Sequence, residues 1–449
     1  MPAKPPSFRN HIREIQTRYE SAIEKLGSKD IRIEAVLLHS GSELVYPYDD
    51  AHMPFRSLGH FKHWMPINLA DQFVLVRPGK RPVFFEVRKD DFWVDTTAQI
   101  DPGFLAPFQV VRVERAEQVL NHLPTQRRIA FLGDSATMAA KLGMPSALIN
   151  EPNLRNHLDY GRSLKTPWEI QQLRTANEGG VIAHEVAYSA FLEGASEFEI
   201  FNRYLEGAGR SELEQPFAPI VCLDEKASIL HYQHRRQTSG RNSRVLLLDA
   251  GHGCNGYAAD ITRTHVRETA HPVFQELNVR VALMMHELIA MCKLGQPYET
   301  IQNATHDKTL HILRDLGIAR GRVEQLKKHK ISHLFFPHGI GHSLGIQVHD
   351  VGGLFKDDSC VLMPPPEEHR SLRMTRKLED TMVYTIEPGI YFIPMLLNPE
   401  RKTPRGKLLN WKLVDQLIPL GGVRHEDDVL ITKKGPVNLT AEAAARVLK

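Results

Sequence analysis

The chain has 449 residues, of which 42% are hydrophobic and 24% charged, a composition typical of a globular protein of two or three domains. Its formal net charge of +3 does not indicate nucleic acid as a partner, and no basic run carries interleaved aromatic residues. No apolar run approaches the length of a membrane span, and Met1-Pro-Ala-Lys-Pro-Pro lacks the apolar core of a signal peptide. The four cysteines are scattered without a Cys-x-x-Cys pair, so we expect no disulfide framework and a reducing cytoplasm as the compartment.

The first third of the chain predicts an α/β domain with a mixed sheet, because strands and helices alternate. The Gly133-Asp-Ser135 turn resembles that of a serine hydrolase, but no histidine partner is evident nearby. We therefore expect Ser135 to cap a helix over 136–142. Hydrophobic periodicity predicts helices over 9–26 and 115–122, and strands over 33–39, 73–76, 83–87, 110–113 and 128–132.

A domain boundary is expected near 150–163, where Glu151-Pro-Asn interrupts the pattern. We accordingly assign 1–160 to an N-terminal domain and 161–449 to a C-terminal domain. Thr166-Pro167-Trp168-Glu169 has the form of a capping box and marks a helix start. The pattern then predicts helices over 169–192, 197–207, 273–293 and 298–316, and a strand over 217–223.

Two aspartates lie in a segment that predicts a β-hairpin with a widened loop. Asp249 ends the apolar run from Val245, and Asp260 follows a glycine-rich turn. A carboxylate at the inner end of an apolar strand costs free energy unless a cation meets it. From these residues alone two readings stay open. The aspartates share a metal ion, or one caps a turn while the other pairs with Arg263.

Three histidines and two glutamates further along the chain favour the metal. His338, His342 and His349 lie among glycines that allow close backbone approach to a ligand, and neutral imidazole binds transition-metal ions. Glu387 and Glu426 interrupt apolar β-rich runs. Four carboxylates with one imidazole suit Mn²⁺, Co²⁺ or Fe²⁺ better than a closed structural zinc site, and they carry enough charge for two dications. The predicted ligands are Asp249, Asp260, His342, Glu387 and Glu426.

The motifs LLDAG, YAADITRT, HGIGH…GIQVHD, TIEPGIY and GVRHEDD resemble those of the pita-bread metallopeptidases. Within that family the likeness is to the Xaa-Pro dipeptidases (prolidases) and their bacterial relative organophosphorus acid anhydrolase, and it covers essentially the whole chain. The subfamily assignment rests on the context of His338 and His342, on Leu230-His231-Tyr232 and on Ser371-Leu372-Arg373. The resemblance implies an α+β fold: an N-terminal α/β, creatinase-like domain for dimerisation and active-site closure, then a pita-bread catalytic domain.

The resemblance also implies a reaction, the hydrolysis of Xaa-Pro dipeptides with release of C-terminal proline. Two divalent ions per subunit, Mn²⁺ foremost and Co²⁺ or Zn²⁺ as substitutes, would bind the five ligands, with Asp260 and Glu426 shared between them. A metal-bridging hydroxide would attack the scissile carbonyl. Glu387 would carry the proton to the leaving nitrogen, His349 would stabilise the oxyanion and His338 would lie near the substrate.

For the substrate, the resemblance implies that His231 and Arg373 hold the C-terminal carboxylate, since an arginine fork pairs bidentately with a carboxylate. Arg424, two residues before a ligand, is expected to steady the acidic cluster. An apolar pocket would select the proline ring and would also admit small phosphotriesters. Its expected lining is Leu230, Val348 and Leu372.

A homodimer is implied as well, in which the N-terminal domain of one subunit closes the site of the other. Asp49, Asp50 and Trp93 are the candidate residues for that contact. One position departs from close bacterial relatives: Phe217 stands where they have tyrosine, which removes a hydroxyl that could donate to the transition state. Tyr298 is a candidate substitute for that hydroxyl.

Two other functions remain open at this point. An aminopeptidase P would remove the first residue of longer Xaa-Pro peptides, and turnover of a dipeptide against a tripeptide separates it from a dipeptidase. A metal-free pita-bread protein would act as a binding module or as a hydrolase of creatinase type. Elemental analysis of the purified protein distinguishes this case from a metallopeptidase.

Overall fold

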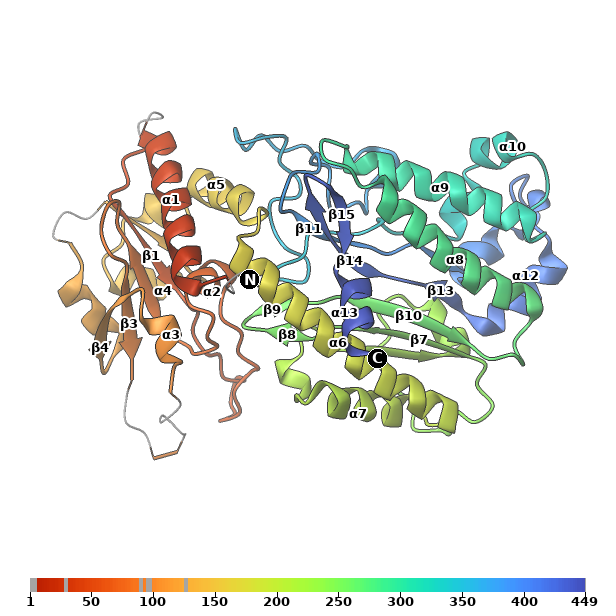
Figure 1. Cartoon of the computed structure of the whole chain (residues 1–449), viewed down its shortest axis with the longest axis horizontal. Coiled ribbons are helices and arrows are strands. Elements are labelled where there is room, and N and C mark those ends of the chain that lie inside the picture. Colours follow the sequence, from red (N-terminus) through yellow and green to blue (C-terminus); the bar gives the residue numbers. More distant parts are fainter. Residues whose placement is uncertain (1–5, 28–30, 89–91, 94–98, 125–127, 449) are drawn as a thin grey trace. The chain divides into compact units, whose positions relative to one another are not determined.

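The computed structural model describes residues 6–27, 31–88, 92–93, 99–124 and 128–448. The chain divides into two compact units, Met1–Gln171 with Asp358–Cys360, and Gln172–Asp357 with Val361–Lys449. The division falls within α6 (Pro167–Glu193), and each unit is described by itself (Figure 1).

The first unit contains a five-stranded sheet in the order β4-β3-β2-β1-β5. β1 is parallel to β5 and β3 to β4, whereas β2 is antiparallel to both of its neighbours. The mixed sheet predicted from the sequence is confirmed. Four of its strands carry wholly or almost wholly buried apolar side chains. The strands are β1 (Ala35–His39), β2 (Phe73–Val76), β3 (Val83–Val87), β4 (Gln109–Val113) and β5 (Ile129–Leu132).

The helices of this unit correct one expectation and confirm another. The expected interruption at Glu151-Pro-Asn is a helix start, because Glu151 caps α5 (Pro152–Arg162) by accepting from the backbone N–H of Leu154 at 2.6 Å. A proline at the first helical position begins a helix here rather than ending one. The short helix predicted over 115–122 is present as the 3₁₀ helix η1 (Ala116–His122). The others are α1 (Phe8–Gly27), α2 (Gly59–Trp64), α3 (Pro102–Leu105), α4 (Ala136–Lys141) and η2 (Ser146–Leu148).

Two predicted helix caps are confirmed. Ser135 Oγ accepts from the backbone N–H of Met138 at 3.0 Å and begins α4. Thr166 and Glu169 form the capping box of α6: the Thr166 N–H donates to Glu169 Oε2 at 2.7 Å, and the Glu169 N–H donates to Thr166 Oγ1 at 3.3 Å.

The second unit is built on short antiparallel sheets. The largest two have the orders β10-β7-β6 and β11-β14-β15, and two-stranded pairs β12-β13 and β8-β9 complete the set. A bridge between Thr262 and Glu426 joins β10 to the turn before β14, so the two larger sheets meet there. The strands are β6 (Ile220–Leu223), β7 (Val245–Ala250), β8 (Gly253–Cys254), β9 (Tyr257–Ala258), β10 (Ile261–Val266), β11 (Val383–Ile386), β12 (Gly389–Tyr391), β13 (Gly422–Arg424), β14 (Asp427–Thr432) and β15 (Gly435–Asn438).

Helices cover these sheets. Apolar side chains of α6 and α7 (Glu197–Ala208) pack against β6 and β7, while α8 (Pro272–Met291) contacts β10 and β13 and packs on α9 (Tyr298–Asp315). Figure 1 shows α8 and α9 running together on one side of the strands and α7 on the other. Every helix within the described ranges is too short or too polar to cross a lipid bilayer. The remaining α-helices are α10 (Val323–Lys328), α11 (Pro394–Leu397), α12 (Trp411–Leu417) and α13 (Leu439–Val447).

Candidate metal and substrate site

The predicted hairpin brings the two aspartates to one pocket in the second unit. β7 pairs with β10 so that Asp249 lies opposite Thr262, and β8 and β9 widen the loop between them. Asp249 ends the buried run of β7, Asp260 directly precedes β10, and both line the pocket. The alternative pairing with Arg263 is wrong, because Arg263 instead forms an ion pair with Asp427 at 2.6 Å.

The two glutamates lie at breaks between strands rather than inside them. Glu387 separates β11 from β12, where Pro388 cannot donate to a sheet ladder. Glu426 separates β13 from β14, and its N–H donates to the Thr262 carbonyl at 3.0 Å. At each break the glutamate side chain need not alternate with its strand neighbours. Both carboxylates line the same pocket as the aspartates.

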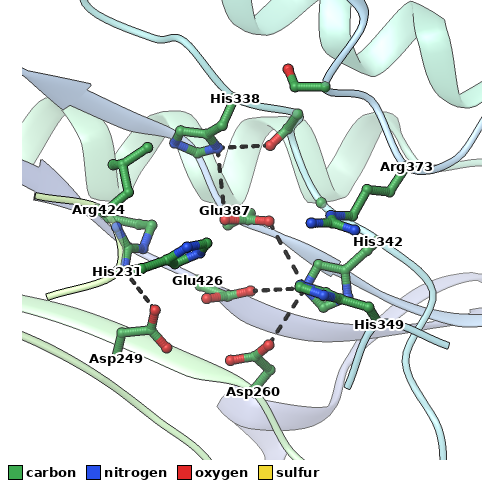
Figure 2. Close-up of a pocket in the computed structure, with 14 residues that line it drawn as sticks. His231, Asp249, Asp260, His338, His342, His349, Arg373, Glu387, Arg424 and Glu426 are labelled. Atoms are coloured by element: carbon green, nitrogen blue, oxygen red, sulfur yellow. Dashed lines mark hydrogen bonds and ion pairs between the residues drawn. The ribbon is translucent and has the colours of Figure 1, made fainter. Parts of the chain in front are cut away.

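His342 lies at the centre of the acidic cluster (Figure 2). Its Nε2 is 3.4 Å from Asp260 Oδ2 and 3.9 Å from the nearest carboxylate oxygens of Glu387 and Glu426. The Nδ1–H donates to the Ser343 carbonyl at 3.1 Å, which leaves the lone pair on Nε2. Because burial lowers the pKa of His342, the ring is neutral and its lone pair faces three carboxylates.

The pKa values of three of these carboxylates are raised, as expected for buried acids that have no compensating cation. Burial, and then repulsion from neighbouring acids, raises the pKa of Asp260 and Glu426 well above the ordinary range. The same causes raise the pKa of Glu387 to about 8. Asp249 Oδ1 and Glu426 Oε1 are buried without a hydrogen-bond partner among the described residues. Ligand atoms of Asp260, His342 and Glu426 all lie within 4.8 Å of one another, so the donor set fits divalent cations.

Arg424 lies against this cluster as predicted, and it neutralises one acid. One guanidinium nitrogen donates to Asp249 Oδ2 at 2.6 Å, a second to the Tyr391 hydroxyl at 3.1 Å and Nε to Thr262 Oγ1 at 3.2 Å. In the described part of the chain, Asp260, Glu387 and Glu426 have no lysine or arginine partner. Three of the four acids in the cluster therefore have no cationic side chain of their own within the described ranges.

The other predicted histidines line the same pocket. His338 Nε2 lies 2.9 Å from the Tyr391 hydroxyl and its Nδ1 lies 3.8 Å from Glu387 Oε2. His349 packs edge-on against His342, with ring centroids 4.4 Å apart. Burial lowers the pKa of His338 to about 3 and that of His349 to about 4, so both rings are neutral near neutral pH.

The predicted substrate residues fall into two groups. Leu230, His231 and Arg373 line the pocket, and the last two are exposed at its mouth. Arg373 forms no ion pair with any residue that the structure describes, so its guanidinium is available to an anion from solvent.

Val348, Leu372 and Tyr298 are not brought to the lining, and these three predicted contacts are corrected. Leu372 is buried, with only 2% exposed, between the lining residues Ser371 and Arg373, and Val348 lies in a bend beside the lining residue His349. Tyr298 is fully buried behind Gly341, where its hydroxyl donates to the Thr385 carbonyl at 2.8 Å. It cannot replace the hydroxyl missing at Phe217, a residue that packs on Gly251 rather than lining the pocket.

Two contributors were missed from the sequence. Thr262 Oγ1 donates to Glu426 Oε2 at 2.8 Å and thereby orients that carboxylate. Strand alternation offered a signal for it, since Thr262 follows Asp260 by two residues and shares its side. Tyr391 joins His338 to Arg424 through one hydroxyl, a contact that no local pattern reveals.

Comparison with known proteins identifies the family. The model of "Metallopeptidase family M24" matches residues 171–433, and that of "Xaa-Pro dipeptidase, N-terminal domain" matches residues 6–160. The chain therefore belongs to metallopeptidase family M24, as its motifs predicted. A Xaa-Pro dipeptidase of Shewanella amazonensis is 35% identical over 439 residues, covering 97% of this chain and 98% of the relative. A Xaa-Pro dipeptidase of Pseudoalteromonas atlantica is 36% identical over 441 residues, with coverages of 97% and 98%.

Solved structures confirm the fold class. Aminopeptidase P from Escherichia coli matches with a TM-score of 0.73 and 22% identity over 99% of both chains. Proline aminopeptidase P II from Yersinia pestis matches with a TM-score of 0.70 and 23% identity over 95% of this chain and 96% of that one. The α+β architecture with a C-terminal pita-bread domain is thus established. Membership of a metallopeptidase family also implies divalent metal ions, for which the acidic pocket is the fitting site.

Proposed function

We propose that the protein is a dinuclear Xaa-Pro dipeptidase, which hydrolyses Xaa-Pro dipeptides and releases C-terminal proline. Family membership supports a metal-dependent peptidase, and full-length likeness to Xaa-Pro dipeptidases supports the substrate class. One observation carries the proposal. The neutral His342 directs its lone pair at three carboxylates, in a pocket whose mouth holds the unpaired Arg373.

The metal ions are assigned to the acidic cluster. Four of the five donors are carboxylates, which favours Mn²⁺, with Co²⁺ or Zn²⁺ as substitutes. When bound, such ions supply Lewis acidity and lower the pKa of a water molecule toward neutrality. The residues that would hold two ions are Asp249, Asp260, His342, Glu387 and Glu426.

Proton transfer is assigned to Glu387. Its carboxylate lines the pocket, where it can accept and release a proton, and His338 Nδ1 lies 3.8 Å from it. His349 is neutral and exposed at the pocket, so a ring N–H can donate to a carbonyl oxygen that gains negative charge. His338 is held by the Tyr391 hydroxyl and would face the substrate.

We assign the limit on substrate length to residues at the mouth of the pocket. Arg373 and His231 would bind the C-terminal carboxylate and so limit the substrate to one residue beyond the cut. A proline nitrogen carries no hydrogen, so the scissile amide donates no hydrogen bond and the site needs no acceptor for one. Leu230 is the apolar side chain from the predicted set that lines the pocket and would contact the pyrrolidine ring. We assign hydrolysis of small phosphotriesters as a side activity, reduced by Phe217.

Assembly and compartment remain proposals of the same kind. We expect a homodimer in which Asp49, Asp50 and Trp93 reach the partner subunit's site. The two acids and Trp93 are exposed. The four free thiols are compatible with the reducing cytoplasm.

The decisive experiment measures hydrolysis of Gly-Pro and Leu-Pro before and after chelation, with Mn²⁺ then added back. We expect activity to disappear on chelation and to return with Mn²⁺. A strong preference for a Xaa-Pro tripeptide over the dipeptide would indicate an aminopeptidase P instead. Absence of stoichiometric bound metal, together with activity that ignores chelation, would indicate the metal-free class.

A further inference from the structure

A second cluster of buried histidines lies in the second unit, outside the pocket. His306 is on α9, His333 in η5 (Ile331–Leu334) and His369 in η6 (Glu367–His369). The His306 ring centroid is 4.2 Å from that of His333 and 5.1 Å from that of His369, and the other two centroids are 6.0 Å apart. One ring nitrogen of each histidine lies within 4.8 Å of one on each of the others. The proposed dipeptidase reaction uses none of the three.

Hydrogen bonds fix where the lone pair of His369 lies. Its Nε2 is 2.8 Å from Asn303 Oδ1, an oxygen that can only accept, so Nε2 carries the proton. The lone pair is therefore on Nδ1, which is buried and has no hydrogen-bond partner among the described residues. His369 is only 4% exposed. An unsatisfied nitrogen at this depth costs free energy that a ligand would recover.

Each of the other two rings also has a nitrogen that can carry a lone pair. His333 Nε2 is buried without a partner within the described chain. For His306, the orientation of Gln302 decides the tautomer. The Ile340 N–H donates to Gln302 Oε1 at 2.7 Å, so the Gln302 amide NH₂ is the group that lies 3.1 Å from His306 Nε2. His306 Nε2 thus carries a lone pair that accepts from the Gln302 amide, so metal binding requires that amide to keep only its contact with the His338 carbonyl at 3.3 Å. The His306 Nδ1–H donates to Ser332 Oγ at 3.1 Å.

We propose that His306, His333 and His369 form a separate all-imidazole site for one transition-metal dication of the Zn²⁺ type. Imidazole nitrogen suits Zn²⁺, Ni²⁺ and Cu²⁺, whereas the oxygen-rich pocket suits Mn²⁺. With metal–nitrogen bonds of about 2 Å and tetrahedral angles, ring centroids in a three-histidine site are about 5 Å apart. The observed separations of 4.2, 5.1 and 6.0 Å bracket that value.

The rings are nearly parallel, at angles of 6° to 17° to one another, so ligation requires them to turn. Imidazole lone pairs lie in the ring plane, and the terminal torsion of histidine is soft enough to permit that rotation. Asn303 and Ser332 are placed to hold the outward nitrogens of His369 and His306, the role that outer hydrogen-bond partners have in histidine metal sites.

An ion at this site would join three segments that flank the substrate pocket. η6 ends two residues before Ser371, which lines the pocket with Arg373. Gln302 links the cluster to the histidine-rich loop, since its amide also lies 3.3 Å from the His338 carbonyl. Occupancy therefore fixes the segment carrying Arg373 against α9, and it does so without supplying a ligand to the catalytic ions.

The test measures zinc stoichiometry in the Mn²⁺-loaded full-length protein. Zn²⁺ is titrated in competition with a chromophoric chelator into wild-type protein, His333→Ala and His369→Gln. We expect wild-type protein to bind one equivalent more than either variant. His311→Ala is the matched control, because it removes an exposed histidine from α9, the helix that carries His306. This variant should bind zinc as wild type does. Equal zinc binding in wild type and both variants would overturn the proposal.

Two further readouts separate loss of the site from loss of the fold. The conservative His369→Gln protein should keep wild-type circular dichroism and, before Zn²⁺ is added, wild-type dipeptide turnover, while losing the extra equivalent. Wild-type protein should gain a higher Tm with added Zn²⁺ than this variant does, because only ligands that bind the folded state stabilise it. Zinc X-ray absorption of the extra equivalent should show a nitrogen shell at about 2.0 Å. A shell of carboxylate oxygens would place the ion in the catalytic pocket and refute the assignment.

Discussion

Arg424 donates a hydrogen bond to Asp249 at 2.6 Å, although 175 residues separate them in the chain. The same guanidinium contacts Thr262 and Tyr391, so one planar fork joins β7, β10, β12 and β13. It removes the charge of a single acid and leaves Asp260, Glu387 and Glu426 without a cation of their own. The pocket is therefore held together by one arginine while keeping the negative charge that metal ions require.

Replacing Arg424 with lysine should weaken metal binding. Lysine keeps the charge but cannot span Asp249, Thr262 and Tyr391 at once. Loss of such an orienting group costs about ten- to a hundredfold in metal affinity or activity. Titrating apoenzyme with Mn²⁺ and following dipeptide turnover measures the effect. Arg401→Lys, which alters a surface pair with Asp415, serves as the control and should leave the titration unchanged. A Mn²⁺ titration of Arg424→Lys that matches wild type would contradict this role.

Replacing Arg373 with alanine should impair recognition of the substrate carboxylate. A hydrogen bond to a charged group contributes about 1.5–3 kcal/mol, so KM for Gly-Pro should rise roughly ten- to a hundredfold. The sharper measurement compares Gly-Pro with its amide, which has no carboxylate. Wild-type enzyme should discriminate strongly, and Arg373→Ala should not.

Arg370→Ala is the matched control for this experiment, because Arg370 is exposed nearby and pairs with Glu367 on the surface. It should keep the wild-type preference for the free dipeptide. If Arg373→Ala still preferred Gly-Pro over the amide to the same degree, another group would have to bind the carboxylate.

Metal removal should make stability fall with rising pH. In the metal-free fold, burial and then the Glu426 charge raise the pKa of Glu387 from 4.5 to about 8, and the pKa of Asp260 and of Glu426 shifts the same way. The folded protein then binds protons more tightly than the unfolded chain. This contribution is fully present below the unfolded pKa and is lost as the pH rises through the folded one.

Thermal unfolding of chelated protein at about pH 7 and about pH 9 checks this sign, since buried neutral histidines affect stability at lower pH. We expect a lower Tm at the higher pH and a smaller difference in Glu387→Gln. Mn²⁺-loaded protein should lack the difference, because bound cations replace the protons. A Tm that rises over this interval in chelated protein would show that the carboxylates are not held protonated by the fold.

Replacing Tyr298 with phenylalanine should affect stability and not chemistry. Its hydroxyl donates to the Thr385 carbonyl behind Gly341, so the variant loses a buried hydrogen bond worth about 1 kcal/mol. Denaturant unfolding should detect that loss, while kcat stays at the wild-type value. A large fall in kcat without loss of stability would instead mean that the hydroxyl reaches the reacting carbonyl.

Features that depend on neighbouring residues were predictable. The capping box at Thr166 and Glu169, the cap at Ser135 and the hairpin carrying Asp249 and Asp260 all follow from patterns within a few residues. The acids that line the pocket were predictable for a similar reason. Burying a carboxylate inside an apolar β-rich run costs free energy wherever it occurs, so each acid can be recognised as a candidate from its own segment alone.

Which side a residue faces, and which distant partner it meets, was decided by the tertiary structure alone. Leu372 and Val348 belong to the right segments, but the fold places their neighbours Arg373 and His349 at the pocket instead. Tyr298 has the right chemistry, but a carbonyl from another strand uses its hydroxyl. The pairing of Arg424 with Asp249 and the meeting of His306, His333 and His369 join segments with no common local pattern. Such contacts depend on how sheets and helices pack, and packing is a property of the whole fold rather than of any stretch of sequence.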